Sequence, residues 1–164
     1  MDTKTRLKRY YMMLRIFLYA DGYDRGEFLK KHKYFKYQGD HCYFQPWNFG
    51  TEPHLISFGN NVHIASDVRF ITHDNTAKMF AYMDGVKKYK YRYGEIKIGD
   101  NVFVGARTNI LYDVSIGNNV IIGAGSLVNK DIPDNCIAGG VPARVLGNFD
   151  DYHKRIVAIN RQNN

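Results

Sequence analysis

Residues 98–147 read IGDNVFVGARTNILYDVSIGNNVIIGAGSLVNKDIPDNCIAGGVPARVLG. An aliphatic residue recurs at every sixth position of this stretch, beginning at Ile98 and ending at Val128. A period of six fits neither an α-helix, which repeats every 3.6 residues, nor long alternating strands. We interpret the repeat as very short strands joined by tight corners. Three hexads then make one triangular turn of a parallel β-helix, whose turns stack at the strand spacing of about 4.8 Å.

The same pattern occurs upstream and is interrupted once. Residues 56–70 keep the hexad, whereas the 28 positions from Phe70 to Ile98 amount to one 18-residue turn plus ten. The excess falls in residues 76–93, which are rich in Tyr and Lys and lack the pattern, so we expect a loop extruded from the coil. Glycine follows several of the aliphatic residues, and we expect it at corners whose backbone a Cβ would strain.

The ends of the chain predict helices that cover the coil. Residues 3–20 and 26–34 are typical of short helices, residues 39–51 of an irregular first turn, and residues 149–161 of a closing helix. Such end elements shield the apolar surface of a terminal turn. The expected fold is mainly β. We expect three segments: a helical segment at 1–37, the β-helix at 38–147 with loop 76–93 extruded, and a C-terminal helical segment at 148–164.

The composition fits one globular domain of 164 residues with plentiful aromatic side chains, which disordered chains lack. Its two cysteines, Cys42 and Cys136, are too few for a disulfide framework and have no metal-binding spacing. We therefore expect reduced thiols and a cytoplasmic location. The formal charge of +7 suits an anionic partner. The N-terminus has a basic start and an apolar run, but Arg15 interrupts that run, so we expect an amphipathic helix that touches the inner membrane face.

Residues 98–147, with their Gly123-Ala124-Gly125-Ser126 and Ala138-Gly139-Gly140-Val141-Pro142-Ala143-Arg144 ending, resemble the hexapeptide-repeat acetyltransferases. The segment ISFGNNVHIASDVRFITHDN at 56–75 is similar to the branch found with capsule, O-antigen and exopolysaccharide genes, and to the xenobiotic acetyltransferases. The resemblance implies a left-handed β-helix, a homotrimer, and acetyl-CoA in the groove between neighbouring prisms.

His73 is the candidate catalytic base. It follows the last regular hexad before the extruded loop, and acetyl transfer from a thioester needs a group that takes the acceptor proton at neutral pH. The resembling branch has its catalytic His at this place. Galactoside and maltose acetyltransferases have theirs after the loop, where this chain has Arg107. Asp74 is the second catalytic candidate: it orients the imidazole, contacts a sugar hydroxyl, or caps the turn.

Candidate acceptor contacts surround this position. Counting one turn back from Phe70 places Glu52 inside the turn below, where a buried carboxylate would orient the base. We favour instead that the irregular segment carrying Pro53 bulges and frees the carboxylate, and the same two alternatives apply to His54. The candidate acceptor-binding residues are Glu52, His54, Asn75 and Tyr82.

The resemblance also implies a cofactor site. Family members hold CoA mainly through backbone groups of successive coils, where small residues let the pantetheine chain approach. Lysine and arginine pair well with its phosphates. The matching positions are Gly105, Ala106, Gly123, Ala124, Ser126, Lys130, Gly140 and Arg144, with Arg107 as a weaker phosphate partner.

The predicted function is acetyl-CoA-dependent O-acetylation of a sugar hydroxyl in surface polysaccharide synthesis, by direct transfer with His73 as general base. The alternatives are xenobiotic acetylation and sugar N-acetylation. A zinc enzyme of this fold needs three His ligands, and residues 98–147 contain none, so we expect no metal. A non-catalytic assembly protein would not need His73. No nucleic-acid-binding motif is present in the sequence, so we expect no nucleic acid partner.

Overall fold

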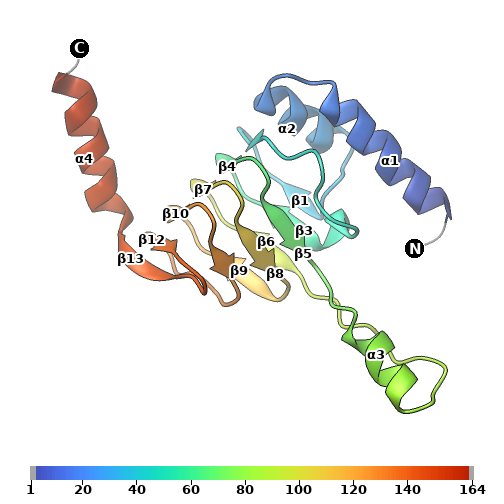
Figure 1. Ribbon diagram of the computed structural model, residues 1–164. Coiled ribbons are helices and arrows are strands. Elements are labelled where there is room, and N and C mark those ends of the chain that lie inside the picture. The colour runs from blue at the N-terminus through green and yellow to red at the C-terminus, as the bar shows by residue number, and fades with distance from the viewer. Residues whose placement is uncertain (1–2, 163–164) are drawn as a thin grey trace.

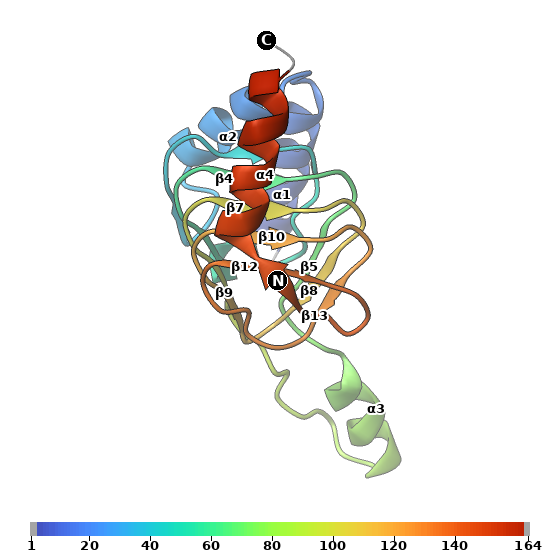
Figure 2. The ribbon, with the colours of Figure 1, turned by 90° about the vertical axis from the view of Figure 1, so that its left-hand side faces the viewer.

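The computed structural model describes residues 3–162, and its centre is a three-sided coil of short parallel strands (Figure 1). Sheet A has the order β1-β3-β6-β9, sheet B the order β13-β12-β10-β7-β4-β2, and sheet C the order β11-β8-β5. Viewed nearly along the stack, the coils enclose the core (Figure 2). The strands are β1 (Tyr37–Gln38), β2 (Tyr43–Phe44), β3 (Ile56–Phe58), β4 (Val62–Ile64), β5 (Arg69–Ile71), β6 (Ile96–Ile98), β7 (Val102–Val104), β8 (Asn109–Leu111), β9 (Val114–Ile116), β10 (Val120–Ile122), β11 (Leu127–Val128), β12 (Cys136–Gly139) and β13 (Arg144–Asn148).

The sequence repeat is the repeat of the coil. The strand register pairs Ile64 with Val104, and it pairs Val104 with Ile122. Val104 and Ile122 are 18 residues apart, which is one turn of the coil. The aliphatic residues of the six hexads from Ile98 to Val128 are all buried, at most 4% exposed. Each strand therefore presents its apolar side chains to the inside of the prism, as the period of six predicts.

Four α-helices of residues 3–162 lie outside the coil. Helices α1 (Thr3–Phe17) and α2 (Gly22–Lys31) cover one end, and α4 (Phe149–Gln162) projects from the other (Figure 1). Helix α3 (Thr76–Met83) lies in the excursion that leaves the coil sideways between β5 and β6. The sequence predicted this excursion as a loop. Its helix was not predicted, because the segment TAKMFAYM shows no hexad and is too short for a clear helical period.

The end of the coil beneath α1 and α2 is filled by aromatic rings. Phe35 packs edge-on against its neighbours, with ring centroids 4.8 Å from Phe58 and 4.9 Å from Phe49. The guanidinium group of Arg25 ties the helices to this first turn by donating to four backbone carbonyls at 2.7–3.3 Å. The acceptors belong to Ile16, Tyr19, Phe44 and Gln45.

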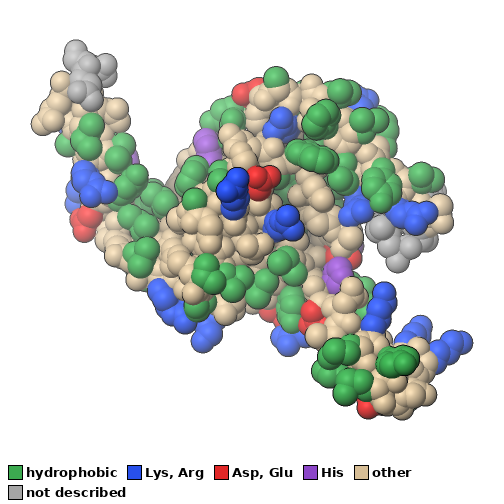
Figure 3. Space-filling model, viewed as in Figure 1, with side chains coloured by type: hydrophobic (Ala, Val, Ile, Leu, Met, Phe, Trp, Pro, Cys, Tyr) green, Lys and Arg blue, Asp and Glu red, His purple; other side chains and the backbone are tan. Residues whose placement is uncertain are grey.

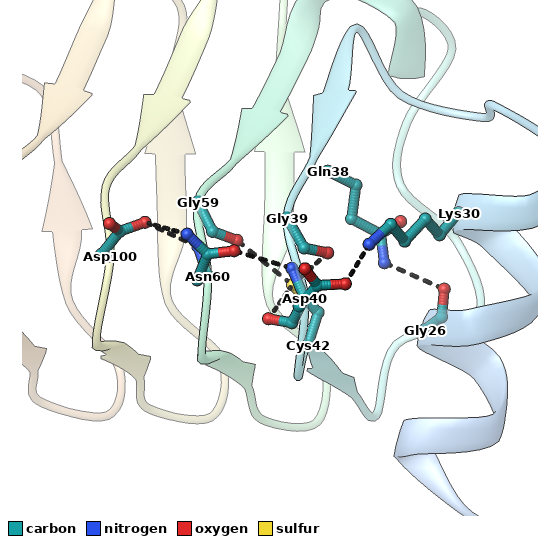
Figure 4. A network of polar contacts seen from close by, with 9 residues as sticks. All are labelled: Gly26, Lys30, Gln38, Gly39, Asp40, Cys42, Gly59, Asn60 and Asp100. Atoms are coloured by element: carbon teal, nitrogen blue, oxygen red, sulfur yellow. Dashed lines mark hydrogen bonds and ion pairs between the residues drawn. The ribbon is translucent and has the colours of Figure 1, made fainter.

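The corner between sheets A and B is held by ladders of short polar side chains (Figure 4). Asn60 accepts from the backbone N–H of Asp40 at 2.9 Å, and Asp100 accepts from that of Asn60 at 2.6 Å. The last member of this ladder in Figure 4, Asp40, forms an ion pair with Lys30 of α2. The first coil and its covering helix are thereby joined.

Glycine at this corner serves close approach rather than unusual dihedral angles. A Cβ on Gly59 would lie 2.7 Å from the backbone carbonyl of Gly99 in the next coil. The left-handed dihedral angles fall two positions later, on asparagines such as Asn101 (φ 55°), which tolerate them better than most side chains. At this corner the structure places the left-handed backbone on asparagines, whereas at the corner between sheets B and C the glycines Gly125 (φ 70°) and Gly140 (φ 96°) adopt it as we expected.

Candidate active site

His73 lies at the edge between sheets C and A, where the excursion leaves the coil. Strand β5 ends at Ile71, Thr72 is buried, and His73 forms an isolated antiparallel bridge with Tyr93. The rings of His73 and Tyr93 have centroids 5.4 Å apart. The outgoing and returning ends of the excursion therefore meet at His73, which sits on rigid coil beside a projecting segment.

The imidazole of His73 is bonded to a half-buried carboxylate. Its Nδ1 lies 2.9 Å from Oε2 of Glu52, and the hydroxyls of Thr72 and Thr51 donate to the same oxygen at 2.6 and 2.7 Å. The side chain of His73 is 27% exposed and that of Glu52 is 16% exposed. A carboxylate only accepts hydrogen bonds, so Nδ1 carries the proton of a neutral imidazole and Nε2 is left as the acceptor.

The surroundings of Glu52 favour its ionised form. Burial acts to raise its pKa, but the hydrogen bonds from Thr72, Thr51 and His73 outweigh burial and hold the pKa below its ordinary value. The expectation that the irregular turn frees this carboxylate is wrong. Glu52 directly precedes the short 3-10 helix η1 (Pro53–Leu55), which turns the chain so that the carboxylate reaches the coil above.

Asp74 is occupied by other partners. One carboxylate oxygen accepts from the backbone N–H and the hydroxyl of Thr76 at 3.1 and 2.7 Å, and the other accepts from the hydroxyl of Tyr112 at 2.8 Å. The hydroxyl of Thr76, then that of Tyr112, lower the pKa of Asp74. Of the three roles considered for Asp74, these contacts favour capping the start of α3. Tyr112 was missed by the sequence reasoning, because its partner lies 38 residues away.

The other candidate acceptor-binding residues differ in exposure and lie on different elements. His54 is exposed on η1, next to the turn that carries Glu52. Asn75 directly precedes α3, and Tyr82 on α3 is 90% exposed. The structure thus brings Glu52 to His73, and places Tyr82 out on the excursion.

The small residues proposed for the cofactor line one edge, between sheets B and C. The N–H of Gly105 donates to the carbonyl of Ile122 at 2.8 Å, and that of Gly123 to Ala138 at 2.8 Å. A Cβ on Gly105 would lie 2.5 Å from the backbone of Ala124, so the coils approach closely here. Ala124 and Gly140 are exposed, whereas Gly105 is buried beneath the next coil and Ala106 is half-buried.

Ser126 differs from the rest of this set. Its side chain is fully buried, and its hydroxyl donates to the carbonyl of Gly123 at 2.5 Å and accepts from the N–H of Gly140 at 3.2 Å. The side chain of Ser126 therefore links two coils, and the contact of this residue with the cofactor stays a prediction that concerns its backbone.

The candidate phosphate partners are exposed and lie apart. Lys130 follows β11 at the edge between sheets C and A, the edge that carries His73. Arg144 begins β13, and its guanidinium group donates to the carbonyl of Ala143 at 2.8 Å. Arg107, with φ 60°, lies at the edge between sheets B and C, with Nε 4.0 Å from the carboxylate of Asp67.

Comparison with known proteins agrees with this architecture. Residues 95–130 match the family model described as bacterial transferase hexapeptide (six repeats). Protein CapG of Staphylococcus aureus is 47% identical over 111 residues, which are 66% of this chain and 62% of CapG. The chain spans less than two thirds of the length of each of the first curated relatives that it matches.

Two solved structures resemble the whole coil. A galactoside acetyltransferase in complex with coenzyme A aligns with TM-score 0.65 and 26% identity, covering 92% of this chain and 84% of that chain. A maltose O-acetyltransferase from Clostridium difficile 630 aligns with TM-score 0.59 and 26% identity, covering 90% and 89%. The chain therefore carries the bacterial transferase hexapeptide repeat over residues 95–130, and its coil resembles those of hexapeptide-repeat acetyltransferases. Its fold is the left-handed parallel β-helix of that family, as predicted.

No group of three or more His, Cys, Asp or Glu side chains among residues 3–162 is arranged to hold a metal ion. No helix in this part of the chain has the length and apolar character needed to span a membrane.

Proposed function

We propose that this chain transfers an acetyl group from acetyl-CoA to a sugar hydroxyl used in surface polysaccharide synthesis. The observation that carries the proposal is the bond from His73 Nδ1 to Glu52, made beside an excursion that borders an open edge of the coil. The similarity to CapG and to the galactoside and maltose acetyltransferases supports it.

In this proposal His73 is the general base. Glu52 fixes the proton on Nδ1, so Nε2 accepts the proton of the acceptor hydroxyl as attack begins. The carboxylate then stabilises the imidazolium that forms. His73 later returns the proton to the departing thiolate. Acetyl-CoA, when bound, supplies the thioester. No side chain needs to carry the acetyl group, and burial raises the pKa of Cys42 to about 11, which leaves that thiol protonated.

The exposed small-residue edge fits the proposed donor. A Cβ on Gly125 would meet nothing within 4 Å, and Ala124 beside it is exposed, so a narrow chain can lie against the backbone there. Oxyanion stabilisation would come from a backbone N–H near residues 104–106 other than that of Gly105, which donates to the carbonyl of Ile122.

The arrangement also supports a site shared between subunits. His73 and the small-residue edge lie at opposite edges of sheet C, separated by a three-residue strand and its corners. At the strand rise this is on the order of 15–20 Å. The proposed acetyl-CoA site and His73 of one chain are therefore far apart. We propose that a homotrimer brings the small-residue edge of one copy to His73 of the next copy. Light scattering tests this: an active monomer of 19.0 kDa would contradict it.

Helix α1 supports a contact with an anionic membrane surface on the cytoplasmic side. One of its faces is buried through Met12 and Ile16, and the opposite face exposes an apolar stripe. The helix contains five Lys or Arg residues and no acidic residue, which suits anionic lipid headgroups. The stripe residues are 50–71% exposed and are Leu7, Tyr10, Tyr11, Leu14 and Phe17 of α1, with Leu18 directly after it. Sedimentation with anionic but not neutral vesicles, lost in Leu7→Ser/Leu14→Ser, is the expected result.

A coupled assay tests the activity. Purified chain is given acetyl-CoA and a panel of hexoses, amino sugars and chloramphenicol, and acceptor-dependent thiol release is followed. We expect thiol release in the presence of a sugar, with an O-acetylated product detected by mass spectrometry. The rate of release should fall strongly in His73→Asn but not in the matched control His41→Asn. Release with chloramphenicol alone would favour the xenobiotic function, and an amide product would favour N-acetylation.

A further inference from the structure

The excursion between His73 and Gly94 concentrates the positive charge of the protein. Residues 76–93 contain five Lys or Arg and one Asp, so they carry +4 of the net +7 in 18 of 164 positions. Figure 3 shows Lys and Arg side chains gathered over the segment that carries α3. Such a local excess attracts an anionic ligand more strongly than the overall charge does.

Most of these cations have no carboxylate partner within the described residues. Arg92 is paired with Asp113 at 3.0 Å, whereas the ion pairs of residues 3–162 include none for Lys78, Lys87, Lys88 or Lys90. The three lysines from 87 to 90 are exposed. Unpaired ammonium groups that lie within a Debye length of one another, about 8–10 Å, repel each other, and an anion bound between them offsets that repulsion.

The charged segment leads directly to His73. Its returning end is fixed by the bridge between Tyr93 and His73, and Tyr91 and Tyr93 have ring centroids 6.2 Å apart. Lys90 is three residues from Tyr93, so their Cα atoms are at most about 11 Å apart. Aromatic rings with polar tips beside the proposed base suit a sugar, and the lysines beyond them suit a charge attached to that sugar.

We propose that the acceptor is a sugar linked to a phosphate or diphosphate, and that Lys87, Lys88 and Lys90 bind that group while the sugar lies against Tyr91 and Tyr93. This inference rests on the proposed function and names its substrate class. Several lysines suit a multiply charged, rotationally tolerant phosphate group better than a single carboxylate, which arginine binds in bidentate fashion. A diphosphate can come from a nucleotide or from a prenyl lipid, and the recognised group is the same in both.

Equilibrium binding to the full-length protein saturated with CoA tests the proposal. The probes are inorganic pyrophosphate, UDP, farnesyl diphosphate and glucuronate. The test variant is Lys87→Gln/Lys88→Gln/Lys90→Gln, and the charge-matched control is Lys31→Gln/Lys33→Gln/Lys154→Gln, whose lysines are exposed on α2, the following turn and α4. We expect the test variant to bind pyrophosphate roughly tenfold more weakly, the scale of three partly exposed charge pairs, and the control to bind as wild type does.

The results of these binding measurements distinguish the source of the diphosphate, and they separate failure of this proposal from failure of the proposed function. UDP or farnesyl diphosphate binding more tightly than pyrophosphate assigns the nucleotide or the lipid source, and equal binding supports the diphosphate alone. Tighter binding of glucuronate, equal loss in both variants, or no pyrophosphate binding overturns the proposal. Loss of CoA affinity in the test variant also overturns it, because the lysines would then serve the donor. Failure of the wild type to bind CoA at all would instead contradict the proposed function.

Discussion

Replacing Glu52 by Gln tests whether the carboxylate positions and supports His73. Glutamine keeps the shape of the side chain and an oxygen that Thr51, Thr72 and His73 can still reach, but it removes the negative charge. The fold and the acetyl-CoA affinity are expected to persist, and the loss is expected in kcat.

The magnitude follows from the 2.9 Å contact between His73 and Glu52. A hydrogen bond to a charged group contributes about 1.5–3 kcal/mol. Each 1.36 kcal/mol of activation free energy is a factor of ten in rate. The carboxylate acts most strongly when the imidazole becomes charged in the transition state, so Glu52→Gln should lower kcat about ten- to hundredfold.

Steady-state kinetics measure this loss, with Glu27→Gln on the exposed face of α2 as the matched control. A kcat within about threefold of wild type, well below the expected loss, would refute the role of Glu52.

Three further predictions concern stability and cofactor binding. Because the pKa of Glu52 is lowered in the fold, its ionisation stabilises the protein fully above about pH 4.3 and stops doing so as pH falls through its lower folded pKa; urea unfolding of wild type and Glu52→Gln should converge over that acidic range. Arg25→Met strands four backbone carbonyls and should lower the free energy of unfolding by about 2–4 kcal/mol in the same assay; an unchanged midpoint would mean that water replaces the guanidinium group. Loss of Lys130 or Arg144 should weaken CoA binding several-fold, and added salt should weaken it too; unaltered calorimetric affinities would show that other cations hold the phosphates.

The fold was predictable because one local rule repeats. Each hexad places an aliphatic residue such as Val104 inside the prism. The assignment of one hexad can therefore be checked against the hexads on either side of it. The position of His73 at the end of the regular repeat also followed from counting residues. These features depend only on sequence separation in a coil whose geometry is fixed.

The partners of His73 were not predictable in the same way. Glu52 lies 21 residues before His73, in an irregular turn that does not follow the hexad repeat. Counting residues therefore placed Glu52 one turn below His73 but did not determine the direction of its side chain. Tyr112 meets Asp74 across the base of the excursion, and Ser126 turns its hydroxyl inward between coils. Such contacts depend on tertiary packing, which residue spacing alone does not encode.

The turnover of His73→Asn tests the central claim most directly. Loss of a general base typically lowers the rate by about 10² to 10⁴. With the acetylated sugar identified, the variant should show a kcat reduced on that scale, an unchanged CoA dissociation constant and an unchanged molecular mass, while His41→Asn remains as active as wild type. A His73→Asn enzyme that kept more than about a tenth of the wild-type rate, outside that range, would contradict the account and direct attention to His54.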